Sequence, residues 1–323
     1  MQHVIRLAVL ALALGTCATA HAQAGYPNKP LRLVNGFPAG GPSDIFARII
    51  AQKLGEVIGQ QVIVDNRAGA NGLIAAEHVA KSAPADGYTF FLSPCAVLAI
   101  HPHLYAKMPV EPKDFAPVTV AVAVPEMLAV HPSLPVKTAR DLVRLAKAKP
   151  GQLVYGSAGS GGMPNLASES FKIAAGINIV HVPYKGAAPA VVDLLGGHLD
   201  LTTLDLPVLL PHVKSGKLRA LAVATAKRAP LLPEVPTMAE AGYPEVNADN
   251  WYGVVVAAAT PKDVVAKLHA ALMTTLQSPE VKQRLAAQGA EAVPSTPEHF
   301  AAFIQSESAK WGKVIKTAGI KLD

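Results

Sequence analysis

A glycine-rich turn between a buried strand and an amphipathic helix is the feature that most restricts what this chain can fold into. Residues 31–52 read LRLVNGFPAGGPSDIFARIIAQ, and their apolar residues recur at helical spacing after the turn, at Ile45, Phe46, Ile49 and Ile50. Ser43 or Asp44 stands where an N-cap is expected. Such a turn aims backbone N–H groups outward at the positive end of a helix dipole, which suits an anion without any catalytic side chain.

A similar unit occurs in the middle of the chain. Residues 152–176 read QLVYGSAGSGGMPNLASESFKIAAG, which predicts a strand, a loop of small residues and a helix from Asn165 onward. Two such units far apart in the sequence predict two half-sites that face one ligand. The competing interpretation is that both turns are glycine-rich only for packing, as in many parallel α/β proteins.

Strands and helices alternate along most of the chain, which predicts parallel sheets with helices on both faces. The hydrophobic content of 50% and charged content of 16% fit buried parallel strands. The expected strands are residues 31–34, 61–64, 88–92, 153–155, 179–182, 199–204 and 218–224. The expected helices are residues 44–57, 73–81, 139–147, 165–175, 188–195 and 208–215, followed by three helices that begin after Thr260-Pro261, Ser278-Pro279 and Thr296-Pro297.

Two long apolar segments, residues 118–130 and 247–257, are suited to cross between domains. A chain that crosses out and back makes its first domain discontinuous. We therefore expect one domain of residues 23–122 plus 250–323 and a second of residues 123–249, with a ligand held where the two close.

The N-terminal residues 1–22 have the pattern of a signal peptide. Arg6 supplies the positive charge, residues 7–14 form an apolar run too short to span a bilayer, and Ala20-His21-Ala22 is a cleavage site. We expect an exported, periplasmic chain that is cleaved near Ala22. A lipoprotein interpretation of Cys17 ranks second, because Thr16 precedes it where a smaller residue is expected.

Charge and motifs exclude several classes of function. The formal charge of +6 weakly favours anionic ligands, and its scattered lysines form no basic run of the kind that binds nucleic acid. Residues 159–164 lack the third glycine of a dinucleotide fingerprint and the Lys-Ser/Thr of a P-loop, and no G-x-S-x-G occurs. His101 and His103 lack the further ligands of a zinc site. We expect a binding protein with no catalytic residue, no metal and no cofactor.

Two alternatives to a transport receptor remain open from the residues alone. One is an exported hydrolase of an anionic substrate with Ser160 or Cys95 as nucleophile, although no base is identifiable for either. Without such a base, Cys95 is better interpreted as a small buried residue. The other alternative is a ligand-sensing module that docks on a membrane kinase.

Five motifs follow one another from Tyr26 toward the C-terminus: YPNKPLRLVNGFPAGGPSDIFAR, VIVDNRAGANGLIAAEHVAKSAPADGYTF, GSAGSGGMPNLASESF, VPYKGAAPAVVDLLGGHLDL and ADNWYGVVV. With them the chain resembles the periplasmic solute-binding receptors of tripartite tricarboxylate transporters, the TctC or Bug family. The resemblance implies a venus-flytrap protein of two α/β domains joined by crossing strands. It also implies a small organic carboxylate as ligand and membrane transporter subunits of the TctA/TctB type as partners; we expect a monomer.

The resemblance also implies which residues bind the ligand. Those of the first loop are Phe37, Ala39, Gly40, Gly41, Ser43 and Asp44; those of the opposing domain are Ser157, Gly159, Ser160, Gly161, Gly162, Met163 and Asn165; wall residues are Tyr184, Lys185 and Asp205. Asn165 stands where the family commonly has histidine, and Gly162 where it has serine or threonine. With fewer hydroxyls and the apolar Met163, the second loop hints at a less polar or aromatic acid. Asp44 has the competing role of a helix cap, because a carboxylate repels an anionic ligand.

Overall fold

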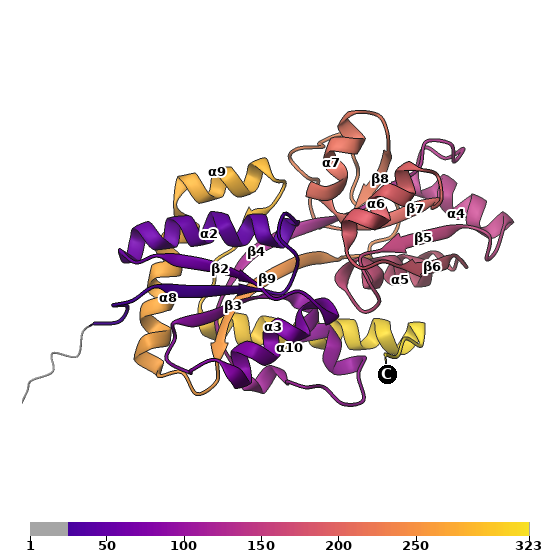
Figure 1. The fold of residues 1–323 in the computed structure, drawn as a ribbon. Coiled ribbons are helices and arrows are strands. Elements are labelled where there is room, and N and C mark those ends of the chain that lie inside the picture. Colours follow the sequence, from indigo (N-terminus) through magenta and orange to yellow (C-terminus); the bar gives the residue numbers. More distant parts are fainter. Residues whose placement is uncertain (1–24, 323) are drawn as a thin grey trace, which may run out of the picture.

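Two lobes of strands and helices are joined by two long strands, β4 (Phe115–Val130) and β9 (Asp249–Ala257) (Figure 1). The computed structural model describes residues 25–322. The predicted signal peptide, residues 1–22, lies outside that range. No helix within the described range is both long enough and apolar enough to cross a membrane.

The first lobe is built on the glycine-rich unit near the N-terminus. Its strands are β1 (Leu31–Asn35), β2 (Val62–Asn66) and β3 (Thr89–Pro94), and β1 pairs in parallel with both neighbours. Its helices are α2 (Pro42–Ile58), α3 (Leu73–Glu77), α8 (Lys262–Gln277), α9 (Pro279–Ala287) and α10 (Pro297–Ala318). Short helical turns are η1 (Ala70–Gly72), η2 (His78–Ser82), η3 (Ala96–Ile100), η4 (His101–His103) and η5 (Pro112–Asp114).

The second lobe repeats the same arrangement. Its strands are β5 (Val154–Ser157), β6 (Val180–Pro183), β7 (Leu201–Asp205) and β8 (Arg219–Val223), and β5 pairs in parallel with β6 and β7. Its helices are α4 (Ala139–Ala148), α5 (Met163–Ala175), α6 (Ala187–Leu195) and α7 (Leu206–Lys214). Figure 1 shows these helices on both sides of the strands, as the alternating sequence pattern predicted.

The joined sheet is mixed, whereas the sequence predicted parallel sheets. The strand order is β2-β1-β3-β9-β4-β7-β5-β6, and both β8 and β10 (Glu291–Ala292) also pair with β4. β4 leads from the first lobe to the second and β9 leads back, so the two run antiparallel to each other. β9 also runs antiparallel to β3 of the first lobe, and β4 runs antiparallel to β7 of the second. The parallel pairs are therefore confined to the interior of each lobe.

A pair of tryptophans fastens α10 to the returning strand β9. The indole Nε1 atoms of Trp251 on β9 and Trp311 on α10 both donate to Oε2 of Glu307, at 3.2 and 3.0 Å. Oε1 of Glu307 accepts from Nζ of Lys310 at 2.7 Å. Trp251 is only 1% exposed, so it is a core residue. One carboxylate thus bonds both tryptophans of the chain.

Candidate binding site

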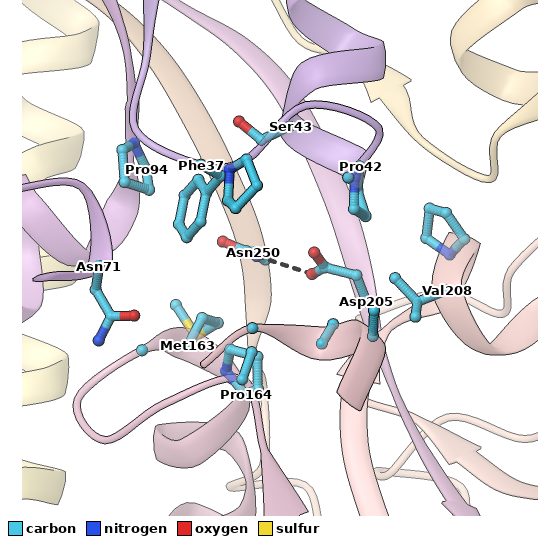
Figure 2. Close-up of a pocket in the computed structure, with 18 of the residues that line it drawn as sticks. Phe37, Pro42, Ser43, Asn71, Pro94, Met163, Pro164, Asp205, Val208 and Asn250 are labelled. Atoms are coloured by element: carbon cyan, nitrogen blue, oxygen red, sulfur yellow. Dashed lines mark hydrogen bonds between the residues drawn. The ribbon is translucent and has the colours of Figure 1, made fainter. Parts of the chain in front are cut away.

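A cavity of about 480 Å³ lies between the lobes. The loops after β1, β3, β5 and β7 line it, together with Asn250 and Tyr252 of the crossing strand β9. This is the position that open α/β sheets favour for ligands, outside the carboxyl ends of their strands. Figure 2 shows Phe37 and Pro42 of the first loop facing Met163 and Pro164 of the second, with Asp205 and Asn250 between them.

Four helices begin at this cavity, and none of the four has a side-chain cap. The N-caps of α2, α5, α6 and α7 are Gly41, Gly162, Gly186 and Asp205, and no side-chain hydrogen bond satisfies their first turns. Of the helices that begin elsewhere, α4, α9 and α10 are capped by the hydroxyls of Thr138, Ser278 and Thr296, whereas α3 and α8 also lack a side-chain cap. At α2, α5 and α6, uncapped first-turn N–H groups and the positive ends of the helix dipoles are thus left free for an anionic ligand, whereas Asp205 places its own carboxyl group at the start of α7.

The start of α2 differs from the prediction in a way that frees its amides. Gly41 is the N-cap and Pro42 is the first helical residue, so Ser43 and Asp44 lie inside the first turn. Proline sets the start of the helix because its fixed φ suits the first position. The N-cap expected at Ser43 or Asp44 is therefore wrong, and the Ser43 hydroxyl instead donates to Oδ1 of Asn35.

Each glycine-rich loop is held by the third residue of the helix that follows it. Oδ2 of Asp44 accepts the Gly40 N–H at 2.9 Å, and Oδ1 of Asn165 accepts the Gly161 N–H at 3.0 Å. Asp44 also accepts from Arg48 and Asn66, each at 2.9 Å.

Although burial raises the pKa of Asp44, the donors from Arg48, Gly40 and Asn66 bring that pKa below its usual value. Asp44 therefore stays ionised, and its negative charge is paired with Arg48 and with the Gly40 N–H of the first loop. Asp44 and Asn165 do not line the cavity; they orient the loops that do.

A buried hydrogen-bond network supports the second loop. Nδ2 of Asn165 donates to the Tyr155 hydroxyl at 3.0 Å, and that hydroxyl donates to Glu169 at 2.6 Å. His181 stacks on Tyr155 with 4.7 Å between ring centroids and hydrogen-bonds the Ser157 hydroxyl at 2.7 Å. Residues 157–162 are therefore fixed from beneath, and of these residues only Ala158 and Gly162 line the cavity.

One hydrogen bond joins the two lobes beside the cavity. Nδ2 of Asn71 donates to the carbonyl oxygen of Ser160 at 2.8 Å. Asn71 has a φ of 49°, in the left-handed region that residues other than glycine rarely adopt. Gly159 lies so close that a Cβ there would meet Oδ1 of Asn71 at 3.1 Å. The lobes are therefore in contact at this point, and the backbone of the first lobe is held in an unusual conformation to make that contact.

The cavity floor is polar and the walls are apolar. Nδ2 of Asn250 donates to Oδ1 of Asp205 at 2.8 Å, and the Cys95 thiol donates to Oδ1 of Asn250 at 3.2 Å. Burial raises the pKa of the Cys95 thiol far above its usual range, so it remains protonated. The walls are formed by Phe37, Pro38, Pro42, Ile45, Pro94, Met163, Pro164, Pro207, Val208 and Tyr252.

The structure brings nine of the predicted ligand-binding residues to the cavity: Phe37, Ala39, Gly40, Gly41, Ser43, Gly162, Met163, Lys185 and Asp205. It places the other seven away from the lining: Asp44, Ser157, Gly159, Ser160, Gly161, Asn165 and Tyr184. Tyr184 instead donates its hydroxyl to Asp193 at 2.5 Å. The second loop reaches the cavity mainly through its last residues, at the start of α5.

Sequence reasoning missed Asn71, Pro94, Asn250, Tyr252 and residues 186–189, all of which line the cavity. Pro94 ends β3, so the rule that ligands sit beyond strand ends could have found it. Asn250 and Tyr252 lie in the predicted crossing segment, but no local pattern shows which residues of such a strand face a ligand.

The histidines singled out in the sequence do not form a metal site. Both ring nitrogens of the buried His101 lack a hydrogen-bond partner, and its ring packs edge-on against Tyr105. His103 instead hydrogen-bonds Ser308 at 2.8 Å. Within residues 25–322, no group of three or more His, Cys, Asp or Glu residues is placed to hold a metal ion.

Comparison with known proteins relates this chain to a family of solute receptors. The model of a family described as "Tripartite tricarboxylate transporter family receptor" matches residues 46–320. Protein BugT of Bordetella pertussis is 38% identical, with 98% of each chain covered. Among solved structures, R. palustris Rpa4515 with adipate has a TM-score of 0.86 and 40% identity, covering 92% of this chain and 99% of that one. MatC from Rhodopseudomonas palustris with bound malate has a TM-score of 0.82 and 28% identity, covering 90% of this chain and all of that one.

Proposed function

Because this chain belongs to the tripartite tricarboxylate transporter receptor family of periplasmic solute-binding proteins, we propose that it captures a small organic carboxylate between its lobes. The observation that carries the proposal is the convergence on one cavity of three helix N-termini that have glycine N-caps, those of α2, α5 and α6. The bound acids of two relatives, adipate in Rpa4515 and malate in MatC, are ligands of this chemical class.

Capture uses main-chain amides in place of reactive side chains. A ligand carboxylate accepts hydrogen bonds from the first turns of α2 and α5, where Gly41 and Gly162 leave room for it to approach. Bonds to a charged acceptor are stronger than neutral ones, and they strengthen further when closure removes water. The bond from Asn71 to the Ser160 carbonyl favours the closed arrangement.

Export of the receptor and delivery of the ligand are proposed by analogy with the family. We propose that the receptor is exported and cleaved near Ala22, acts as a monomer and delivers its ligand to membrane subunits of the TctA/TctB type. We also propose the domain division at residues 122/123 and 249/250, because both boundaries fall within or at the start of the crossing strands β4 and β9.

Catalysis is not part of the proposal, since the two nucleophiles considered are poorly placed for it. Ser160 does not line the cavity, and its carbonyl is engaged by Asn71. Cys95 lines the cavity, but its thiol is held protonated by burial and donates to Asn250. An activated nucleophile needs an adjacent base or a lowered pKa, and neither residue has one on the described part of the chain.

Thermal denaturation with a panel of carboxylates tests the proposed function. A ligand present at 100 times its dissociation constant is expected to raise the free energy of unfolding by about 2.7 kcal/mol. The matched control for each acid is its primary amide, which has the same shape without the charge. Ligand carried over from the host is first removed by unfolding and refolding. A broad panel without any shift in melting temperature would contradict carboxylate capture.

Replacing Asn71 with glycine is expected to weaken ligand binding about 2- to 13-fold, which corresponds to one neutral hydrogen bond of about 0.5–1.5 kcal/mol. Glycine adopts the left-handed backbone freely, so the substitution removes the side chain of Asn71 and its bond to Ser160 without straining the backbone. Ala70→Gly changes the neighbouring residue of positive φ and keeps the bond, which makes it the control. Calorimetry gives the affinity and small-angle scattering gives the fraction of open molecules. An N71G protein as closed and as tight as the wild type would show that the bridge contributes nothing.

A further inference from the structure

A fully buried glutamate lies beneath the cavity floor. Glu126 on β4 is directly opposite Asp205 on β7 in the antiparallel register, so both side chains project from the same face of the sheet. Glu126 is 0% exposed, and neither of its carboxylate oxygens accepts a hydrogen bond from any N–H or O–H group of the described residues. Asp205 is 9% exposed and lines the cavity beside Asn250 (Figure 2). The two carboxyl groups therefore form a buried pair, of which the aspartate faces the ligand space.

Within residues 25–322, no Lys, Arg or His side chain forms an ion pair with either carboxyl group, although Lys185 lines the same cavity as Asp205. The other groups that face this pair are the carboxyl of Asp249 and the hydroxyl of Tyr252 from β9 and the thiol of Cys95 after β3. Burial and the neighbouring Asp205 raise the pKa of Glu126 well above its usual value. Burial also raises the pKa of Asp205, against the donor from Asn250.

Two buried carboxyl groups placed directly opposite each other cannot both ionise readily, so their titrations are coupled. A negative charge on Asp205 is favourable where it lies, because Asp205 is the N-cap of α7 and the positive end of that helix dipole points at it. The floor of the cavity thus holds a buried carboxyl pair in which one negative charge is stabilised.

We propose that Glu126 and Asp205 share one proton and that this pair sets the ligand class, accepting a hydrogen bond from a hydroxyl group of the ligand and repelling a second carboxylate. The inference rests on the proposed capture of a carboxylate. A carboxylate oxygen has two acceptor positions, and Asn250 and Glu126 leave some of those on Asp205 free for the ligand. The apolar walls formed by residues such as Phe37, Met163 and Val208 suit a hydrocarbon segment between the two polar ends. The expected ligand is therefore a hydroxy-monocarboxylic acid.

Three six-carbon acids that differ only at one end test the proposal by calorimetry at pH 7. They are 6-hydroxyhexanoate, adipate and hexanoate, with a hydroxyl, a carboxylate and a methyl group at that end. We expect 6-hydroxyhexanoate to bind at least about tenfold more tightly than adipate, equivalent to about 1.4 kcal/mol, and more tightly than hexanoate. Adipate binding as tightly as the hydroxy acid overturns the inference and leaves carboxylate capture standing. So does a failure of the hydroxy acid to bind when another acid of the panel binds. Failure of every carboxylate overturns both.

Asp205→Asn should erase the preference, because it removes the charge and supplies an amide donor to a second carboxylate. Asp263→Asn is the matched control, because Asp263 is exposed in the first turn of α8 and does not line the cavity. We expect D205N to bring the affinities for adipate and 6-hydroxyhexanoate together and D263N to keep them apart. An unchanged preference in D205N, or an equal loss of preference in D263N, overturns the role of the pair.

Glu126 acts as a positioning residue, so its test is a pH profile. In the wild type, hexanoate affinity should fall as the pH rises and the shared proton leaves the pair, which then carries two negative charges. Glu126→Gln still donates to Asp205 but has no proton to release, so that fall should be absent. A merely structural role for Glu126 would alter affinity equally at every pH. The same fall in E126Q as in the wild type overturns the shared proton.

Discussion

Gly162→Asp is expected to abolish ligand binding while leaving the protein as stable as the wild type, or slightly more stable. Gly162 has a φ of −84° and a ψ of 165°, which any residue adopts, and a Cβ there would meet its nearest neighbour only at 3.7 Å. Aspartate is among the best N-cap residues, so its carboxylate should bond the first-turn N–H groups of α5. It would thereby occupy the anion site and repel a ligand.

The expected loss of affinity is about 100-fold or more, because hydrogen bonds to a charged group contribute about 1.5–3 kcal/mol each. Calorimetry with the best acid of the panel measures the affinity, and urea denaturation measures the stability. Ser278→Asp is the matched control, since it places the same side chain at the N-cap of α9, which does not begin at the cavity. Binding by G162D within a few-fold of the wild type would remove the start of α5 from the site.

Trp251→Ala is expected to lower the free energy of unfolding by about 3–5 kcal/mol, as large aromatic truncations in protein cores do. The indole ring lies 5.7 Å from the Phe300 ring and 5.2 Å from the Phe303 ring, both on α10. Its Nε1 shares Glu307 with Trp311. Truncation therefore leaves a void under α10 and weakens the attachment of that helix to the returning strand.

Urea denaturation followed by the fluorescence of Trp311, which remains as the single tryptophan, measures this loss. Trp251→Phe is the informative comparison: it retains most of the ring and loses the hydrogen bond, for which we expect a cost of about 1 kcal/mol. If W251A were no less stable than W251F, the aromatic contact between β9 and α10 would contribute nothing to the free energy of unfolding.

The first half-site could be predicted from the sequence because it is local. The strand, the Gly-Pro turn and the apolar period of α2 lie within residues 31–52, and Phe37, Ala39, Gly40 and Gly41 follow from that pattern once the family is recognised. The helix start was misplaced by two residues, since α2 begins at Pro42 and not at Asp44. That shift matters, because it leaves a glycine instead of a hydroxyl side chain at the N-cap.

The second half-site was predicted less well because its orientation is not local. The loop of residues 157–162 was expected to face the ligand along its whole length. Instead, Asn165 bonds both Tyr155 and the Gly161 N–H, and Asn71 bonds the Ser160 carbonyl. These contacts turn most of the loop away from the cavity, which is lined mainly by Gly162 and Met163 at the end of the loop. These contacts depend on the folded arrangement of the chain, and the spacing of apolar residues in the sequence does not predict them.

By itself, the sequence determined the alternation of strands and helices, the two crossing segments and the two glycine-rich helix starts. Each of these depends on residues close together in the chain, whose backbone preferences and apolar spacing act locally. Only the tertiary structure decided that Glu126 meets Asp205, that Asn250 reaches that pair, and that Asn71 closes on the opposite lobe. The physical reason is that strand register and lobe contact bring together side chains whose charges and hydrogen bonds have no counterpart in the local sequence.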